Sequence, residues 1–213
     1  MKALIIYSGG MDSTVLLHEY RKEIQLAVSF DYGSKHARQE LKMARCNCER
    51  QSIKHRVIAL PFVCELFRSS LLQGQEEIPE GSYNDQNMLS TVVPFRNGIM
   101  LSIAAGIAES NGLDTLLIAN HSGDHFIYPD CSEAFIDNMG QAIRRGSCNN
   151  VNLISPYCEM SKRDIALRGK KMEVDFSQTY SCYKGHALHC GKCGTCIERR
   201  EALNGFDPTV YEI

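Results

Sequence analysis

The first ten residues constrain the fold more than any other segment. Lys2 to Tyr7 is a short, almost continuous apolar run, and Ser8-Gly9-Gly10 follows it directly. A short apolar run without polar alternation favours a strand that is buried on both faces. The glycines end that strand, and Asp12 or Ser13 can then cap a following helix. The chain therefore begins with the pattern of an α/β domain.

The same alternation continues along the chain. Its order predicts an α/β, doubly wound fold with a mainly parallel sheet and helices on both faces. A long polar segment, Gln73 to Ser90, interrupts the order and is either a lid over a site or a tolerated surface insertion. Strands are expected at 2–7, 24–32, 56–60, 115–120 and 151–157, and helices at 12–22, 35–51, 96–111, 132–145 and, after the capping-box pattern Ser161-x-x-Asp164, at 165–172.

Composition excludes several other classes of protein. Of 213 residues, 44% are hydrophobic and 23% charged, which is typical of a globular chain rather than a disordered one. The net charge of −2 argues against a non-specific nucleic-acid surface. No apolar stretch reaches the length of about 18 residues that a membrane span requires, and the start does not resemble a signal peptide. We therefore expect a cytoplasmic protein with no membrane contact and no direct nucleic-acid contact.

The segment after the first predicted strand has the character of an anion site. Its eight residues combine flexible glycines with hydroxyl groups, and they lead into a helix whose N-terminus attracts phosphate. The segment is neither a Walker A motif nor G-x-G-x-x-G, and the alternative is an ordinary strand-to-helix turn. Asp12 is unusual in an anion site unless it binds a cation such as Mg²⁺ or caps the helix. We predict that the whole segment binds ATP: Tyr7, Ser8, Gly9, Gly10, Met11, Asp12, Ser13 and Thr14.

The cysteines indicate a metal site near the C-terminus. Six of the ten are scattered, but Cys182, Cys190, Cys193 and Cys196 lie within fifteen residues, with glycines between them. Four thiolates at C-x2-C spacing suit a closed, structural zinc site. Two disulfides or an iron–sulfur cluster are the alternatives, and a reducing compartment disfavours the disulfides. We expect residues 1–175 to form the nucleotide and substrate domain, and residues 176–213 a zinc-binding appendage with a terminal helix.

Two resemblances to known families follow from these motifs. Ser8-Gly9-Gly10-Met11-Asp12-Ser13 resembles the S-G-G-x-D-S loop of the PP-loop ATP pyrophosphatases, whose fold is that of the adenine nucleotide alpha hydrolases. Members of that superfamily cleave ATP to AMP and diphosphate, usually to adenylate a carboxylate, amide or carbonyl oxygen. The loop together with the cysteine pattern also resembles the 7-cyano-7-deazaguanine synthase family. Further stretches resemble that family in order: Asp31 to His36, Val93 to Asn97, Tyr128 to Cys131, Pro156 with Lys162, and Ser181 to Gly185.

The second resemblance implies a reaction in the pathway to queuosine and related deazapurines. ATP would activate 7-carboxy-7-deazaguanine as an acyl-adenylate, and ammonia would displace AMP to give the amide. A second activation of the amide and loss of AMP would leave the nitrile. Catalysis of such a ligase would rest on positioning and on neutralising phosphate charge. The family also implies a homodimer, for which the apolar helix at 96–111 is a candidate surface, although it equally suits the core.

The resemblance assigns roles to individual residues. Asp12, Ser13 and Arg96 would be catalytic, with Arg96 pairing with a phosphate or with the substrate carboxylate. His121 and His125 could line the site and shuttle protons or be ordinary loop histidines, and Cys131 is expected to pack rather than attack. Substrate-binding residues would be Arg96, Asn97, Asn120, Asp124, Asp130 and Lys162.

Two departures from the family pattern and three rival functions remain. Phe95 and Phe126-Ile127 stand where smaller residues are expected, beside predicted substrate residues. The main alternative is a PP-loop enzyme that adenylates the same or a similar carboxylate but uses a different amine or sulfur acceptor. A tRNA-modifying member of the superfamily is disfavoured by the net charge. A non-catalytic nucleotide sensor is disfavoured by the intact loop.

Overall fold

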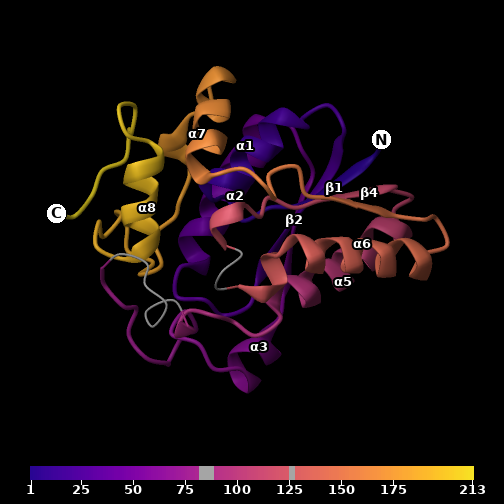
Figure 1. Ribbon diagram of the computed structural model, residues 1–213, viewed down its shortest axis with the longest axis horizontal. Helices are drawn as coiled ribbons and strands as arrows, with labels where there is room; N and C mark the ends of the chain where they lie inside the picture. The colour runs from indigo at the N-terminus through magenta and orange to yellow at the C-terminus, as the bar shows by residue number, and fades with distance from the viewer. Residues whose placement is uncertain (82–88, 125–127) are drawn as a thin grey trace.

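The protein is built on one five-stranded parallel sheet (Figure 1). The computed structural model describes residues 1–81, 89–124 and 128–213, without the side chain of Asp124. The strand order is β3-β2-β1-β4-β5, and each neighbouring pair is parallel. The predicted doubly wound fold is therefore confirmed. The strands are β1 (Ala3–Ile6), β2 (Ile24–Asp31), β3 (His55–Ala59), β4 (Thr115–Leu117) and β5 (Asn152–Ile154).

Helices cover both faces of the sheet. Side chains of α1 (Met11–Glu19), α2 (Ala37–Arg50) and α7 (Lys162–Lys171) pack against one face. Those of α5 (Arg96–Ser110) and α6 (Glu133–Gly146) pack against the other. Figure 1 shows α5 and α6 side by side, on the side of the strands away from α1 and α7. The remaining elements of the described residues are α3 (Pro61–Leu66), α8 (Gly194–Ala202) and the 3-10 turns η1 (Ser122–Asp124), η2 (Pro129–Cys131) and η3 (Phe176–Gln178).

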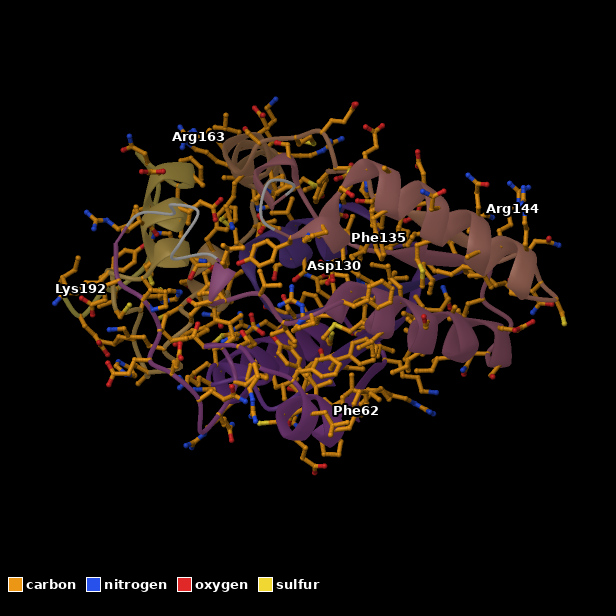
Figure 2. All side chains as sticks on the ribbon, turned by 60° about the horizontal axis from the view of Figure 1, so that its bottom comes forward. Phe62, Asp130, Phe135, Arg144, Arg163 and Lys192 are labelled. Atoms are coloured by element: carbon orange, nitrogen blue, oxygen red, sulfur yellow. The ribbon has the colours of Figure 1, made fainter. Side chains whose placement is uncertain are left out.

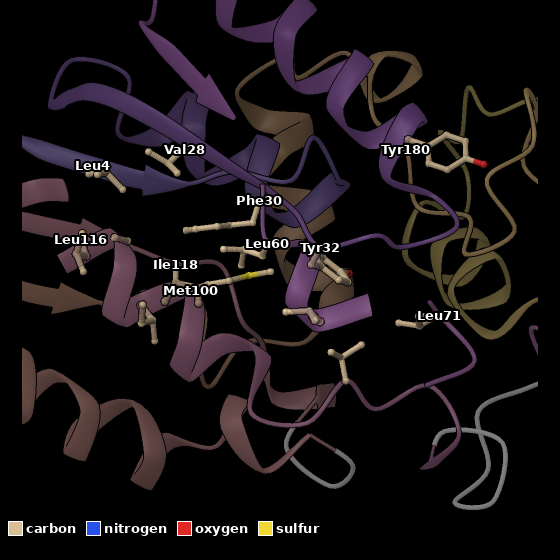
Figure 3. Close-up of a cluster of buried hydrophobic side chains, with 14 of the residues drawn as sticks. Leu4, Val28, Phe30, Tyr32, Leu60, Leu71, Met100, Leu116, Ile118 and Tyr180 are labelled. Carbon is tan, nitrogen blue, oxygen red and sulfur yellow. The ribbon is translucent and has the colours of Figure 1, made fainter. Parts of the chain in front are cut away.

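Alternation along the central strands explains the two-sided core. In β1, Leu4 faces α5 while Ala3 and Ile5 face α1 and α7. Figure 3 shows the α5 side of the core, where strand side chains such as Leu4, Val28 and Leu116 lie near Met100 of α5. Because both faces are covered, both sets of positions are apolar, and the strand sequence shows no polar alternation. Among the described residues, no helix is both long and apolar enough to cross a membrane.

One local prediction was wrong, and one short helix was not predicted. The first helix begins at Met11, with Gly10 as N-cap and no side-chain cap, so neither Asp12 nor Ser13 caps it. The backbone already turns at the glycines, which places Asp12 in the first helical turn. The helix that was not predicted is α3, which starts at Pro61 because the fixed φ of proline suits the first helical position. The capping box of Ser161 with Asp164 is confirmed at the start of α7.

Gly9 lies in the tightest backbone contact of the loop after β1. Its φ is +83°, a left-handed conformation that side chains disfavour. A Cβ built on it would lie 2.5 Å from the backbone oxygen of Glu40 and 2.8 Å from the backbone nitrogen of Ala44. Only glycine lets the loop pack directly on the backbone of α2 at this position. The contact therefore helps to fix where the loop lies relative to the sheet.

We expect Gly9→Ala to lower the free energy of unfolding by about 2–5 kcal/mol, because backbone strain adds to a clash that no side-chain rotation relieves. Gly74→Ala is the matched control, since Gly74 also has a positive φ but has no neighbour within 4 Å of the added Cβ. It should lose only about 1–2 kcal/mol. Denaturant unfolding of both variants measures the difference, and equal losses would contradict the packing argument.

Candidate active site

Among the described residues, a cavity opens where the strand order reverses, between the carboxyl ends of β1 and β4. Ligands bind at this position in doubly wound sheets. The cavity has a volume of about 240 Å³. Its walls come from the loop after β1, the residues after β4, the start of α5, the first turn of α2 and the C-terminal segment. Predicted site residues on its wall are Tyr7, Ser8, Gly10, Met11, Asp12, Ser13, Arg96, Asn97, Asn120, His121, Cys131 and Lys162.

Hydrogen bonds within the loop hold it open toward the cavity. The Ser8 Oγ accepts a hydrogen bond from the Gly10 backbone N–H (3.1 Å) and lies 3.0 Å from the Ser13 Oγ. Thr14 points the other way, because its hydroxyl donates to the Gly10 carbonyl and lies 3.0 Å from the Tyr7 hydroxyl. Thr14 and Gly9 are not on the cavity wall, so they shape the loop rather than face a ligand. Ser8, Gly10 and Ser13 lie on the cavity wall.

Asp12 carries an unsatisfied carboxylate oxygen at the end of the cavity that is formed by the loop after β1. Its Oδ1 is buried and has no hydrogen-bond partner among the described residues. Its Oδ2 lies 3.4 Å from the Lys162 Nζ and 4.0 Å from the His121 Nε2. The His121 Nδ1 accepts a hydrogen bond from the Gly123 N–H (3.1 Å), so a neutral His121 carries its proton on Nε2. A carboxylate oxygen without a partner is chemically suited to a hard cation such as Mg²⁺.

Lys162 is not a solvated side chain. Its Nζ is 2.8 Å from a carboxylate oxygen of Glu198, on α8, and the side chain is 13% exposed. Glu198 therefore joins the C-terminal segment to the phosphate end of the cavity. The sequence analysis missed Glu198, because a glutamate inside a charged helical run gives no signal of its own.

The other end of the cavity contains Arg96. The Arg96 Nη1 donates to the Tyr32 hydroxyl (3.3 Å), and the guanidinium lies over the Tyr32 ring at 5.8 Å. Arg96 is the first residue of α5, and Phe95 before it adopts a left-handed conformation with φ of +51°. Phe95 is 58% exposed and meets Phe135 edge to face at 5.8 Å. It lies outside the cavity lining, so its aromatic ring does not fill the pocket.

Hydrogen bonds connect the chain segments that contain the predicted substrate residues Asn97, Asn120 and Asp130. The Asn97 backbone N–H donates to the Asp130 carboxylate (2.7 Å), and the Asn97 Nδ2 donates to the Cys131 Sγ (3.1 Å). The Asn120 Nδ2 donates to the Cys131 carbonyl (2.6 Å). These bonds hold η2 between α5 and β4. Figure 2 shows Asp130 near the middle of the molecule, whereas Arg144, Arg163 and Lys192 project from its rim.

Two further ionisable groups line the cavity on α2 and its cap. The His36 Nε2 lies 3.7 Å from the Glu40 Oε2. Burial lowers the pKa of His36 to about 4 and raises that of Glu40 to about 8, with Arg96 lowering both in part. His36 is therefore neutral at pH 7, and Glu40 titrates near working pH. The sequence analysis quoted His36 in a motif but missed Glu40.

Several predicted residues lie outside the described part of the chain. These are His125, Phe126-Ile127, the side chain of Asp124 and residues 82–88 of the predicted loop at 73–90. The backbone of Asp124 ends η1, which follows His121 directly. Its role in substrate binding remains a prediction.

The four clustered cysteines are gathered around one point. All four are buried, and their Sγ atoms lie within 4.8 Å of one another. The Sγ atoms of Cys190 and Cys196 are 3.9 Å apart, against about 3.8 Å for two thiolates on a tetrahedral zinc with Zn–S bonds of about 2.3 Å. The Cys190 N–H points at the Cys182 Sγ (3.4 Å), and the Cys193 N–H at the Cys190 Sγ (3.3 Å). All ten cysteines are free thiols, so the cluster is a site that could hold a metal ion.

Comparison with known proteins decides the family. A family model described as "Queuosine biosynthesis protein QueC" matches residues 2–207. The chain belongs to the QueC family. Curated relatives named 7-cyano-7-deazaguanine synthase include one from Porphyromonas gingivalis, 54% identical over 99% of this chain and 97% of the relative. Others come from Desulfotalea psychrophila (53%, 98% of each chain) and Rhizobium etli (46%, 100% of this chain and 92% of the relative).

A solved structure supports the fold alone. NMN synthetase from Francisella tularensis superposes with a TM-score of 0.53 at 13% identity, over 98% of this chain and 79% of that one. The overlap covers the parallel sheet and its helices. The predicted fold class and family resemblance are therefore confirmed, while the site residues stay predictions.

In this QueC family member, a buried arginine links the cysteine segment to the loop after β1. Arg199 is fully buried and donates to Thr179, Ser181 and Thr209 hydroxyls and to the Phe176 carbonyl, at 2.7–3.0 Å. The segment it holds donates from the Tyr180 N–H to the Gly9 carbonyl (3.1 Å). The segment that carries the cysteines thus supports the loop after β1.

We expect Arg199→Lys to lower the free energy of unfolding by about 2–4 kcal/mol, because an ammonium cannot reproduce the planar, multiply bonded guanidinium. Arg200→Lys on the same helix is the control, since Arg200 is exposed and should lose less than about 0.5 kcal/mol. Chemical denaturation of the two variants tests the point. Equal stability of the two variants would contradict it.

Proposed function

We propose that the chain is a 7-cyano-7-deazaguanine synthase, which converts 7-carboxy-7-deazaguanine and ammonia to the nitrile with two ATP-dependent activations. The observation that carries the proposal is one cavity lined both by the loop after β1 and by Arg96. The phosphates of ATP and a carboxylate substrate can therefore meet in one place. Full-length similarity to proteins named for this reaction supports the substrate class.

The loop would bind the nucleotide. Ser8, Gly10 and Ser13 present hydroxyl and amide groups, and α1 adds the partial positive charge of its N-terminus. Asp12 would hold Mg²⁺ through its unpaired Oδ1, and the ion would neutralise charge on the phosphates. Lys162, 3.4 Å from Asp12, is close enough to pass to a phosphate oxygen when ATP binds.

Arg96 would orient the acid. Its guanidinium can bind a carboxylate with two parallel hydrogen bonds, which fixes the plane of the acid for attack on the α-phosphate. In this proposal the main role of Asn97, Asn120 and Asp130 is to hold η2 against the start of α5. Their hydrogen bonds, which join α5 and the residues after β4 to η2, support this role. Asn97 and Asn120 also line the cavity and can meet the pyrimidine-like edge of the deazapurine, whereas Asp130 lies outside the lining.

The four cysteines would hold one structural zinc ion. Zinc with four thiolate ligands has no open position, so it supplies folding energy rather than chemistry. The N–H groups directed at sulfur and the Sγ separations support this assignment. The metal would stabilise the start of α8, the helix that carries Glu198 and Arg199.

The proposal also covers a cytoplasmic location and a homodimer. On α5, Ile99, Ile103 and Ile107 recur at helical spacing and are only partly buried. The opposite side of the helix packs on the sheet, so α5 serves the core first. This partly exposed row is the candidate for a dimer contact.

Incubation with ATP, Mg²⁺, ammonia and 7-carboxy-7-deazaguanine should yield AMP, diphosphate and the nitrile, detected together by mass spectrometry. Asp12→Asn should lower both products by about 10²–10³-fold, because phosphate charge is no longer neutralised. Asp137→Asn, an exposed change on α6, is the control and should leave the rate unchanged. AMP without nitrile would indicate a different amine or sulfur acceptor, and intact ATP with folded protein would refute the proposal.

Elemental analysis should find about one zinc per chain, and Cys190→Ala should abolish it, because a structural site requires all four thiolates. Cys148→Ala should retain the metal, since Cys148 is exposed and outside the cluster. Iron with visible absorbance in the wild-type protein would instead indicate an iron–sulfur cluster.

A further inference from the structure

The proposed reaction makes a specific demand on proton transfer. Ammonia enters with three hydrogens on nitrogen, and the nitrile leaves with none. One proton departs when nitrogen displaces AMP from the acyl-adenylate, one when the amide oxygen is adenylated, and one when AMP leaves to form the nitrile. The first adenylation, of the carboxylate, releases no proton. A base in the cavity must therefore serve three steps but not the first.

We propose that Glu40 is the proton acceptor for the reacting nitrogen, with His36 beside it. This inference rests on the proposed function and adds a residue to it. Glu40 lines the same cavity as Arg96, in the first turn of α2. Within the described residues its carboxyl forms no hydrogen bond, and its ion-pair distance within 4.0 Å is the one to His36. No fold-supporting contact therefore occupies this carboxyl.

Geometry around Glu40 suits a base rather than a fixed anion. Its side chain is 22% exposed, so water can take up a transferred proton between steps. The backbone of Glu40 packs against Gly9, where a Cβ would come within 2.5 Å of the Glu40 backbone oxygen, so this turn of α2 lies directly beside the loop after β1. Arg96 faces it from α5, and the Tyr183 ring from the C-terminal segment packs 5.5 Å from the His36 ring.

Ionisation of these groups agrees with the assignment. Burial raises the pKa of Glu40 to about 8, which brings the carboxyl close to working pH, where a general base is most effective. Burial lowers the pKa of His36 to about 4, so the neighbouring imidazole is neutral and does not lock Glu40 in an ion pair. A neutral imidazole can still donate or accept one hydrogen bond as Glu40 changes state.

Each step balances. In amination the N–C bond forms, the C–O bond to AMP breaks with its electron pair leaving on AMP, and the nitrogen proton passes to the Glu40 carboxylate. In amide activation the carbonyl oxygen attacks the α-phosphate, diphosphate leaves, and an N–H proton passes to Glu40. In the last step the C–O bond breaks again, AMP leaves, and the remaining N–H proton passes to Glu40. Glu40 returns each proton to water.

The test compares Glu40→Gln with Glu49→Gln, an exposed change on the same helix. Carboxylate-dependent exchange of labelled diphosphate into ATP reports the first adenylation and should stay within about threefold of wild type in both variants. Amide-dependent exchange and nitrile formation should fall about 10²–10⁴-fold in Glu40→Gln only. Loss of carboxylate-dependent exchange in a folded Glu40→Gln would show a binding role, and unchanged nitrile formation would show no role. Either result overturns the inference.

A pH profile of the amide-to-nitrile step, which uses no ammonia, gives an independent reading. The wild-type rate should rise as pH increases through about 8, because only the deprotonated carboxylate accepts a proton, and the rise should be absent in Glu40→Gln. Glu40→Asp should recover part of the rate, and thermal unfolding checks that each variant is folded. If the wild-type protein shows no carboxylate-dependent exchange at all, the proposed function itself fails, which separates that failure from a failure at Glu40.

Discussion

The contact of Gly9 with its neighbours supports the rest of the site. On one side its backbone packs against the first turn of α2, and on the other its carbonyl accepts a hydrogen bond from Tyr180. The loop after β1 is therefore held between α2 and the segment that carries the four clustered cysteines. This arrangement places Gly10, Asp12 and Ser13 at the carboxyl edge of the sheet, where the strand order reverses. A side chain at Gly9 would prevent the close approach of the loop to α2 and would displace the loop from this edge of the sheet.

Charge is distributed unevenly within the cavity. Near the loop after β1, Asp12 and Glu198 share Lys162. Elsewhere on the cavity wall, Arg96 faces Glu40 and the neutral His36. In the proposed function, the first group of residues would bind the phosphates and their metal ion. The second group would orient the acid and accept protons from its nitrogen.

Much of this architecture could be predicted from the sequence. All five strands were predicted in their order along the chain, because short apolar runs alternate with helix-length segments. The cysteine cluster was predicted from spacing, since short C-x2-C turns force neighbouring sulfurs together. The loop was located from its glycines and hydroxyls.

What the sequence did not reveal are contacts across distant segments. Glu198 and Glu40 are ordinary glutamates in charged helices, and only the fold brings them to one cavity. Arg199 lies in the same charged helix as Glu198, and its hydrogen bonds all go to neutral groups in distant segments. The predicted caps at Asp12 and Ser13 were wrong because the glycines already turn the backbone. Tertiary geometry, rather than local pattern, decides these roles.

A crystal structure with Mg²⁺, a non-hydrolysable ATP analogue and 7-carboxy-7-deazaguanine tests the central claim most directly. The account predicts phosphates over Gly10 and Ser13, a magnesium ion on the Asp12 Oδ1, and the substrate carboxylate between Arg96 and the α-phosphate. Nucleotide bound away from the loop after β1, or a substrate whose carboxylate is turned away from Arg96 and the α-phosphate, would contradict it.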